Sequence, residues 1–356
     1  MRKLLIVSIF LINTVYAQSL DKCFDVFIPN KLTTNSVRVK AVTKNAYKYL
    51  NKSVDNWFEN TNVRNSQKCL SCHTTLPYMM LGAADNLLTK KNYIRELVQK
   101  RTDNFKRDGF VEADNLPWYE LNKSYSTEVV LNASSVVMAE KLVARNAGLS
   151  DLAKDAYNLM WKRQKQDGSF EWLDHFGLRP HESQNSGYWG TSMAGVMGGL
   201  VESQASSKLK KTYKYLAEEF ESQSNHNKLF GLWANAEARG DSFLSIAKVN
   251  KLLKEIKSKQ NADGGWSSDF ILGTGETQTD AYATSIVAFV LKNSDQAVPN
   301  ERAVRKLLVE KLEKSGETIG TRSMNGAAVS PSPNGISGSD FFSDMATSYG
   351  LMYLNK

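Results

Sequence analysis

The sequence predicts an all-α protein in which about six helix pairs form an inner and an outer helical layer. Two observations support this prediction. One plan recurs along the chain: an amphipathic helix, a turn with Asp-Gly and an aromatic residue, a loop, and a second helix. The second helices are apolar on all sides, which is typical of an inner layer. Helix pairs bury their apolar faces only against neighbouring pairs, so these pairs can close into a two-layered barrel.

Composition agrees with a globular chain. Of its 356 residues, 42% are hydrophobic and 23% are charged, which allows a large core. The formal net charge is +8, spread over helical faces, and no nucleic-acid-binding motif accompanies it, so no nucleic-acid partner is expected. The basic residues form either a solvated surface or a docking patch for an acidic partner.

The N-terminus has the pattern of a secretory signal. Basic Arg2 and Lys3 precede an apolar run at 4–12, and small residues lead to Ala17. The run is too short to cross a membrane, which takes about twenty apolar residues, and no later run is long enough either. We therefore expect a signal peptide at 1–17 cleaved after Ala17, an N-terminal extension at 18–35, a single domain at 36–356, no membrane span, and a periplasmic or extracellular location.

The helix pairs are expected in chain order. The first pair has its outer helix at 42–57 and its inner helix at 75–88, with an insert at 57–75 that contains two of the cysteines. Further outer helices are expected at 152–165, 209–223 and 247–259. The Asp-Gly turns are Asp108-Gly109-Phe110, Asp167-Gly168-Ser169-Phe170 and Asp263-Gly264-Gly265-Trp266. The unit at 209–223 lacks this turn and continues into an apolar segment at 229–234.

The inner helices align on a hydroxyl residue. It is Thr127, Thr191, Thr284 and Thr347 in four of them, and Thr75 takes the same place in the first. We expect these threonines to cap the first turns of their helices.

Two of the turns carry a resemblance to a known family. Residues 164–170 (Gln-Lys-Gln-Asp-Gly-Ser-Phe) and 260–266 (Gln-Asn-Ala-Asp-Gly-Gly-Trp) are similar to the glutamine-tryptophan repeats of squalene and hopene cyclases and protein prenyltransferases. The resemblance covers roughly residues 36 to 356 and implies an α/α toroid, with the repeat turns as ties between outer helices. Cyclase activity is not implied, because 276–281 (Glu-Thr-Gln-Thr-Asp-Ala) has a lone Asp280 where that family has an Asp-rich acid motif. The zinc ligands of prenyltransferases are not found together either.

The cysteines point to a cofactor. The chain has three cysteines, and two of them fall in Cys69-Leu70-Ser71-Cys72-His73, the attachment pattern of a c-type haem. In that pattern the two thiols add to the porphyrin vinyl groups and the adjacent histidine binds the iron. We therefore expect one covalent haem c with His73 as the proximal iron ligand. A Cys69–Cys72 disulfide and a zinc site that recruits Cys23 are the alternatives.

The repeat register places residues around this haem. His73 aligns with one residue of each inner helix, two positions before the threonine: Tyr125, Trp189, Tyr282 and Met345. The three aromatic residues are expected to flank the porphyrin or, alternatively, to pack the loops. Met345 is the first candidate for the distal iron ligand, where a thioether would raise the reduction potential. Met193, His175 and His181 are the next candidates, and an open five-coordinate iron is the other alternative.

We expect the protein to be an exported monohaem c-type cytochrome. Its haem either exchanges electrons with a redox partner protein or performs other redox chemistry. The sequence leaves open whether the protein is an enzyme. A toroid enzyme acting on a polysaccharide or a terpenoid is one alternative, in which acid and base come from Glu182, Glu276 or Asp280. Another is a binding module for an apolar small molecule, in which the haem is accessory and the loop at 321–340 covers the cavity.

Overall fold

The computed structural model describes residues 31–60, 68–82, 86–109, 121–173, 186–315 and 338–356. Predictions about 1–17, most of 18–35, Cys23, His175, His181 and Glu182 lie outside these residues. The predicted all-α class is confirmed, because the strands in the described part are only the two-residue β1 (Trp266–Ser267) and β2 (Thr279–Asp280), which pair antiparallel. None of the described helices has the length and apolar character needed to cross a membrane.

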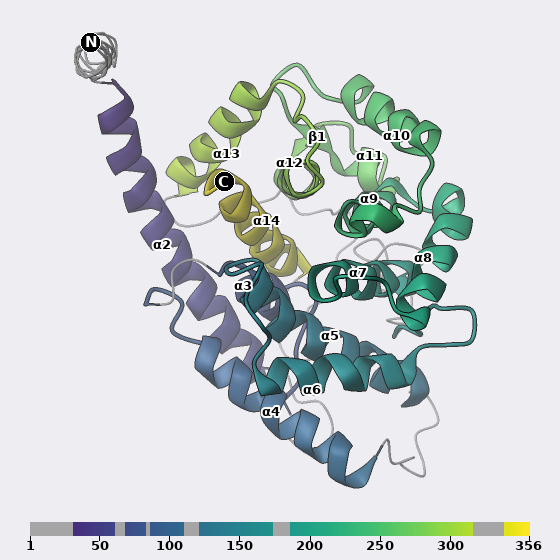
Figure 1. Cartoon of the computed structure of the whole chain (residues 1–356). Coiled ribbons are helices and arrows are strands. Elements are labelled where there is room, and N and C mark those ends of the chain that lie inside the picture. Colours follow the sequence, from purple (N-terminus) through teal and green to yellow (C-terminus); the bar gives the residue numbers. More distant parts are fainter. Residues whose placement is uncertain (1–30, 61–67, 83–85, 110–120, 174–185, 316–337) are drawn as a thin grey trace, which may run out of the picture.

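Twelve of the described helices fall into two sets. The outer helices, at the periphery of Figure 1, are α2 (Lys31–Asn60), α4 (Lys91–Asp108), α6 (Asp151–Met160), α8 (Ser207–Glu219), α10 (Ile246–Ser258) and α13 (Glu301–Ser315). The inner helices are α3 (Thr75–Met80), α5 (Leu121–Lys141), α7 (Ser186–Val201), α9 (Asn225–Glu237), α12 (Ala281–Asn293) and α14 (Gly338–Leu354). The short α11 (Ser268–Leu272) and the 3-10 turns η1 (Trp161–Arg163), η2 (Phe220–Ser222) and η3 (Arg239–Asp241) connect them.

The inner helices contact one another in a closed series. Contacts run from α3 to α5, then to α7, α9, α12 and α14, and α14 contacts α3 again. Their burial explains this arrangement: every residue of α7 from Tyr188 to Leu200 is buried, and so is every residue of α12 from Ala281 to Leu291. A helix without a polar face is stable only when neighbours surround it, and here other helices do so.

Some predicted boundaries were wrong. The first inner helix was expected at 75–88, but α3 ends at Met80 and Gly82 follows with φ +52°. A left-handed residue stops a helix, and a side chain at Gly82 would meet Cγ2 of Val143 at 2.5 Å. At the other end of this unit α2 begins at Lys31, inside the segment expected as an extension.

The repeat threonines have another role than the one expected. Thr191 and Thr284 lie inside their helices, and each donates to the carbonyl four residues earlier, Gly187 or Asp280. The Thr191 hydroxyl also accepts from Phe170 N at 3.0 Å, and that of Thr284 accepts from Trp266 N at 3.0 Å. The backbone of the turn aromatic is therefore held by the next inner helix. The prediction that these threonines cap their helices was wrong, and in α12 the cap is Asp280.

In the two repeat turns that contain a glutamine, this residue ties neighbouring outer units together, as expected. Gln164 Nε2 donates to the carbonyl of Lys208 at 2.8 Å and to Thr212 Oγ1 at 2.9 Å, both in α8. Gln260 Nε2 donates to the carbonyl of Pro299 at 2.7 Å, just before α13. The turns hold successive helix pairs in register.

The Gly168 turn allows a first prediction. Gly168 has φ +94°, and a Cβ on it would lie 2.2 Å from the carbonyl oxygen of Lys211. Gly168→Ala is expected to lower the free energy of unfolding by at least about 2 kcal/mol, because both the left-handed backbone and the contact with α8 are disturbed. Urea denaturation measures this. Gly148→Ala is the control, since nothing lies within 4 Å of its Cβ position, and it should change stability by less than about 0.5 kcal/mol. Equal effects would contradict the prediction.

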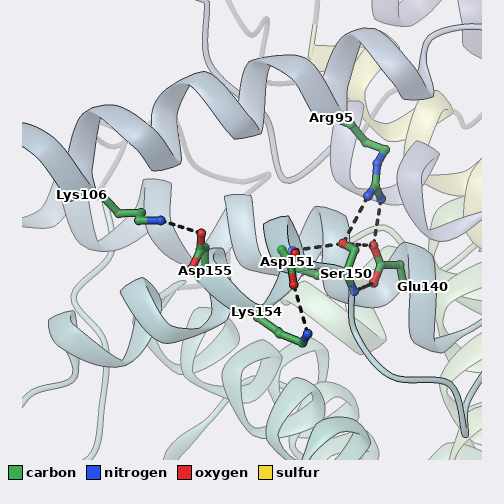
Figure 2. Close-up of polar contacts among 8 residues, drawn as sticks. Arg95, Lys106, Glu140, Ser150, Asp151, Lys154 and Asp155 are labelled. Atoms are coloured by element: carbon green, nitrogen blue, oxygen red, sulfur yellow. Dashed lines mark hydrogen bonds and ion pairs between the residues drawn. The ribbon is translucent and has the colours of Figure 1, made fainter.

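A polar network joins α4, α5 and α6 (Figure 2). The Arg95 guanidinium donates to Glu140 Oε1 at 3.0 Å and to Ser150 Oγ at 3.3 Å, and Ser150 N donates to Glu140 Oε2 at 2.9 Å. Nearby, Lys106 pairs with Asp155 at 2.7 Å. Burial opposes ionisation of Glu140, but the hydrogen bonds from Ser150 and Arg95 outweigh it and lower its pKa.

This lowered pKa predicts an acid-dependent loss of stability. The Glu140 contribution is complete above the ordinary glutamate pKa of about 4.3 and is lost as the pH falls through the lower pKa of the folded state. Glu140→Gln should therefore reduce the free energy of unfolding by about 1 kcal/mol at pH 7 and by less at acid pH, measured by thermal unfolding across pH. Glu310→Gln, in an exposed pair with Lys306, is the control and should have little effect at any pH. A pH-independent effect of Glu140→Gln would contradict this assignment.

Candidate cofactor pocket

The cysteine-histidine motif forms a compact turn at the start of α3. Ser71 Oγ accepts from Thr74 N and Thr75 N, each at 3.1 Å, and Ser71 N donates to Thr75 Oγ1 at 2.8 Å. These bonds satisfy amide groups that a helix start leaves without partners. They fix the backbone that presents Cys72 and His73.

Cys72 and His73 line a pocket of about 600 Å³, counted to its open mouth. Its other walls come from α7, α9, α12 and α14 and are mainly aromatic. The lining residues are Cys72, His73, Trp172, Ser186, Trp189, His226, Phe230, Tyr282, Phe341, Phe342, Met345 and Tyr349. An apolar pocket with few polar groups is the usual form of a small-molecule or cofactor site.

Aromatic rings hold the His73 imidazole on two sides. Phe341 stacks on it with ring centroids 3.7 Å apart and planes at 28°. Trp57 meets it edge-on at 4.9 Å and 81°. The Trp57 indole nitrogen also donates to the carbonyl of Cys69 at 2.8 Å, so one side chain positions both ends of the motif.

A chain of hydrogen bonds determines the His73 tautomer. Thr74 Oγ1 donates its single hydrogen to Asp344 Oδ2 at 2.6 Å, and Tyr49 donates to Asp344 Oδ1 at 2.9 Å. Thr74 Oγ1 lies 3.0 Å from His73 Nδ1 and, having given its hydrogen to the carboxylate, must accept from it. Nδ1 therefore has the proton and Nε2 has the lone pair. A metal-binding histidine commonly has its other nitrogen held in this way.

Cys69 lies apart from the pocket lining. Burial is the main cause that raises its thiol pKa to about 12, and the charge of Glu128 adds to this while Arg101 opposes it. Arg101 and Glu128 form a short ion pair between α4 and α5. Such a thiol is protonated at neutral pH and unreactive by itself.

The structure gathers most of the expected site residues. Cys72, His73, Trp189, Tyr282 and Met345 line the one pocket. Tyr125 does not, because it packs edge-on against Phe105 of α4, with centroids 5.7 Å apart. The alternative ligand Met193 is fully buried in α7, outside the lining.

Of the carboxylates considered for acid-base chemistry, Glu276 and Asp280 lie in the described ranges, and neither lines this pocket. Asp280 is 5% exposed and accepts from Ala283 N at 2.9 Å, and burial raises its pKa. Glu276 is exposed. In the described ranges no three histidine, cysteine, aspartate or glutamate side chains come together as a metal site. The zinc alternative with Cys23 falls outside those ranges.

Sequence reasoning missed His226. It is the second residue of α9 after the cap Ser224, and Tyr282 is the second residue of α12 after the cap Asp280. The helix pair that contains α9 has no threonine at the aligned position, so aligning the inner helices on their threonines leaves His226 out. Aligning them on their N-cap residues instead places His226 at the same position as Tyr282. His226 Nε2 lies 2.8 Å from the Tyr282 hydroxyl, and burial lowers the His226 pKa to about 4.

Comparisons with protein-family models, curated proteins and solved structures found no match to this chain. The interpretation of the pocket therefore depends on its own residues.

Proposed function

We propose that this chain is an exported monohaem c-type cytochrome with an α/α toroid fold. One haem c is attached through Cys69 and Cys72, and His73 is its proximal iron ligand. The closed series of inner helices supports the toroid, and the signal-like residues 1–17 support a periplasmic or extracellular location. The observation on which the proposal chiefly depends is the His73 tautomer, with its lone pair on Nε2, at the edge of an aromatic pocket.

The residues of the pocket fit a porphyrin. Its aromatic walls suit a flat apolar ring, and Cys72 and His73 are among the residues that line it. A bound haem would supply one-electron chemistry at its iron. The protein would exclude water through Trp189, Phe342 and Tyr282 and would orient His73 through Thr74 and Asp344. Met345 and His226 both line the pocket as candidate distal ligands.

An exported cytochrome needs a redox partner, and we expect this partner to be a second protein. His73 lines the pocket and is partly exposed, so a docked protein could approach it. Without Arg2 and Lys3 of the signal peptide, the formal charge falls from +8 to about +6, which still favours an acidic partner.

The test is expression of the chain in a bacterial host that attaches haem to exported cytochromes. We expect an intact mass equal to residues 18–356 plus one haem that remains after denaturation in acid and organic solvent. The pyridine complex should show one haem per chain. A haem-free chain from a host that matures a control cytochrome would contradict the proposal.

A second candidate function is binding of an apolar small molecule in the same pocket. Its support is the lining of aromatic side chains with the His226–Tyr282 pair as a polar contact. In that case the haem-free chain should take up an apolar fluorescent probe, and a chain with haem should not. Equal uptake by both forms would contradict a shared pocket.

A further inference from the structure

The order of the inner helices places α9 across from α3. Going round the closed series in either direction, two helices separate them: α5 and α7 on one side, α12 and α14 on the other. His73 precedes the first turn of α3 and His226 lies in the first turn of α9, so both are at helix starts. Both side chains line the same pocket. The two imidazoles thus come from opposite walls.

Met345 comes from the wall beside His73. It is in α14, which contacts α3, and it lies one turn from Phe341, the ring stacked on His73. Asp344, next to Met345, holds His73 through Thr74. We therefore expect Met345 to lie on the same side of the haem as His73, and not opposite it.

Hydrogen bonds determine the His226 tautomer as well. Gln223 Nε2 donates to the carbonyl of Glu219 at 3.2 Å, which leaves Gln223 Oε1 to accept from Asn227 Nδ2 at 3.0 Å. Asn227 Oδ1 therefore faces His226 Nδ1 at 3.4 Å, and an amide oxygen only accepts, so Nδ1 has the proton. His226 Nε2 then has the lone pair and accepts from the Tyr282 hydroxyl.

We propose that His226 is the distal iron ligand, opposite His73, and that Tyr282 holds its Nε2 until the haem is in place. This inference rests on the proposed function. Ligation exchanges the hydrogen bond from Tyr282 to Nε2 for a bond from the same lone pair to the iron, so no proton leaves His226. Both axial ligands are then neutral imidazoles whose Nδ1 protons are held by the protein.

The test compares absorption and electron paramagnetic resonance spectra of four proteins with attached haem: wild type, His226→Ala, His226→Met and Met345→Ala. We expect wild type and Met345→Ala to be six-coordinate and low-spin, without a thioether-to-iron band. His226→Ala should be high-spin and bind carbon monoxide, and added imidazole should restore the low-spin spectrum. His226→Met should remain six-coordinate and gain the thioether band, which a merely structural role would not produce.

Two outcomes would overturn the proposal: a change of spin state in Met345→Ala but not in His226→Ala, or a high-spin wild type. A His226→Ala protein that misfolds is recognised by failure of imidazole to restore it, and His226→Met then decides alone. The intact mass is measured first. A chain without covalent haem contradicts the proposed function itself, and His226 ligation with it, before any spectrum is recorded.

Discussion

Replacing Cys69 and Cys72 together by alanine is expected to abolish covalent haem completely. In the proposed attachment each thiol supplies one thioether bond to the porphyrin, so the double variant would have no covalent link left, although His73 is intact. The intact mass should fall to that of the haem-free chain. Cys69 and Cys72 are both partly buried, and loss of two sulfur atoms removes little core packing, so the fold should persist by circular dichroism.

Single variants and a third cysteine make this test specific. Cys69→Ala and Cys72→Ala each leave one thiol and should retain a single thioether, which shifts the absorption of the reduced pyridine complex to longer wavelength. Cys23→Ala is the matched control and should keep one haem per chain. Covalent haem in the double variant, or its loss in Cys23→Ala, would show that attachment does not use the motif.

Asp344→Asn is expected to weaken the bond between His73 and the iron by about 10- to 100-fold, the usual effect of losing a partner behind a metal ligand. The carboxylate accepts from Thr74 Oγ1 and so leaves that oxygen to accept from His73 Nδ1. An amide that donates to Thr74 turns its hydroxyl toward Nδ1, which moves the imidazole proton to Nε2 and removes the lone pair from the iron side.

The measurement is competition for the iron by added cyanide, together with the reduction potential, which should rise because a less electron-rich imidazole stabilises ferric iron less well. Tyr49→Phe is the matched control. It removes the other hydrogen bond to Asp344 at 2.9 Å but leaves Thr74 in place, so cyanide should compete no better than in wild type. Similar competition in Asp344→Asn and wild type would mean that Thr74 and Asp344 do not orient His73.

The outer helices could be predicted from the sequence because their apolar residues recur with the helical period. The outer helix expected at 247–259 is α10 at Ile246–Ser258, and the one expected at 209–223 corresponds to α8 with η2. Helix ends depend on single residues instead. α3 ends before Gly82, which has a φ of +52° and where Val143, distant in the sequence, leaves no room for a side chain.

The sequence predicted those pocket residues that occupy equivalent positions in successive repeats. Trp189, Tyr282 and Met345 were placed near His73 by counting from threonines, and all three line its pocket. Tyr125 was placed by the same count but packs against Phe105, an aromatic residue of α4. The Thr74 and Asp344 bonds could not be predicted, because they join residues 270 positions apart whose only sequence signal is that both are polar.

The last helix has a consequence for the timing of maturation. α14 supplies Phe341, Met345 and Tyr349 to the pocket and Asp344 to the hydrogen-bond chain of His73, and it closes the series of inner helices next to α3. A chain is synthesised and exported from its N-terminus, so the cysteine motif emerges long before this wall. If the proposed haem attachment holds, the enzyme that performs it would meet Cys69 and Cys72 before this wall of the pocket has formed. Packing of α14 against α3 would then enclose the proposed haem, so closure of the fold would be the last step of its loading.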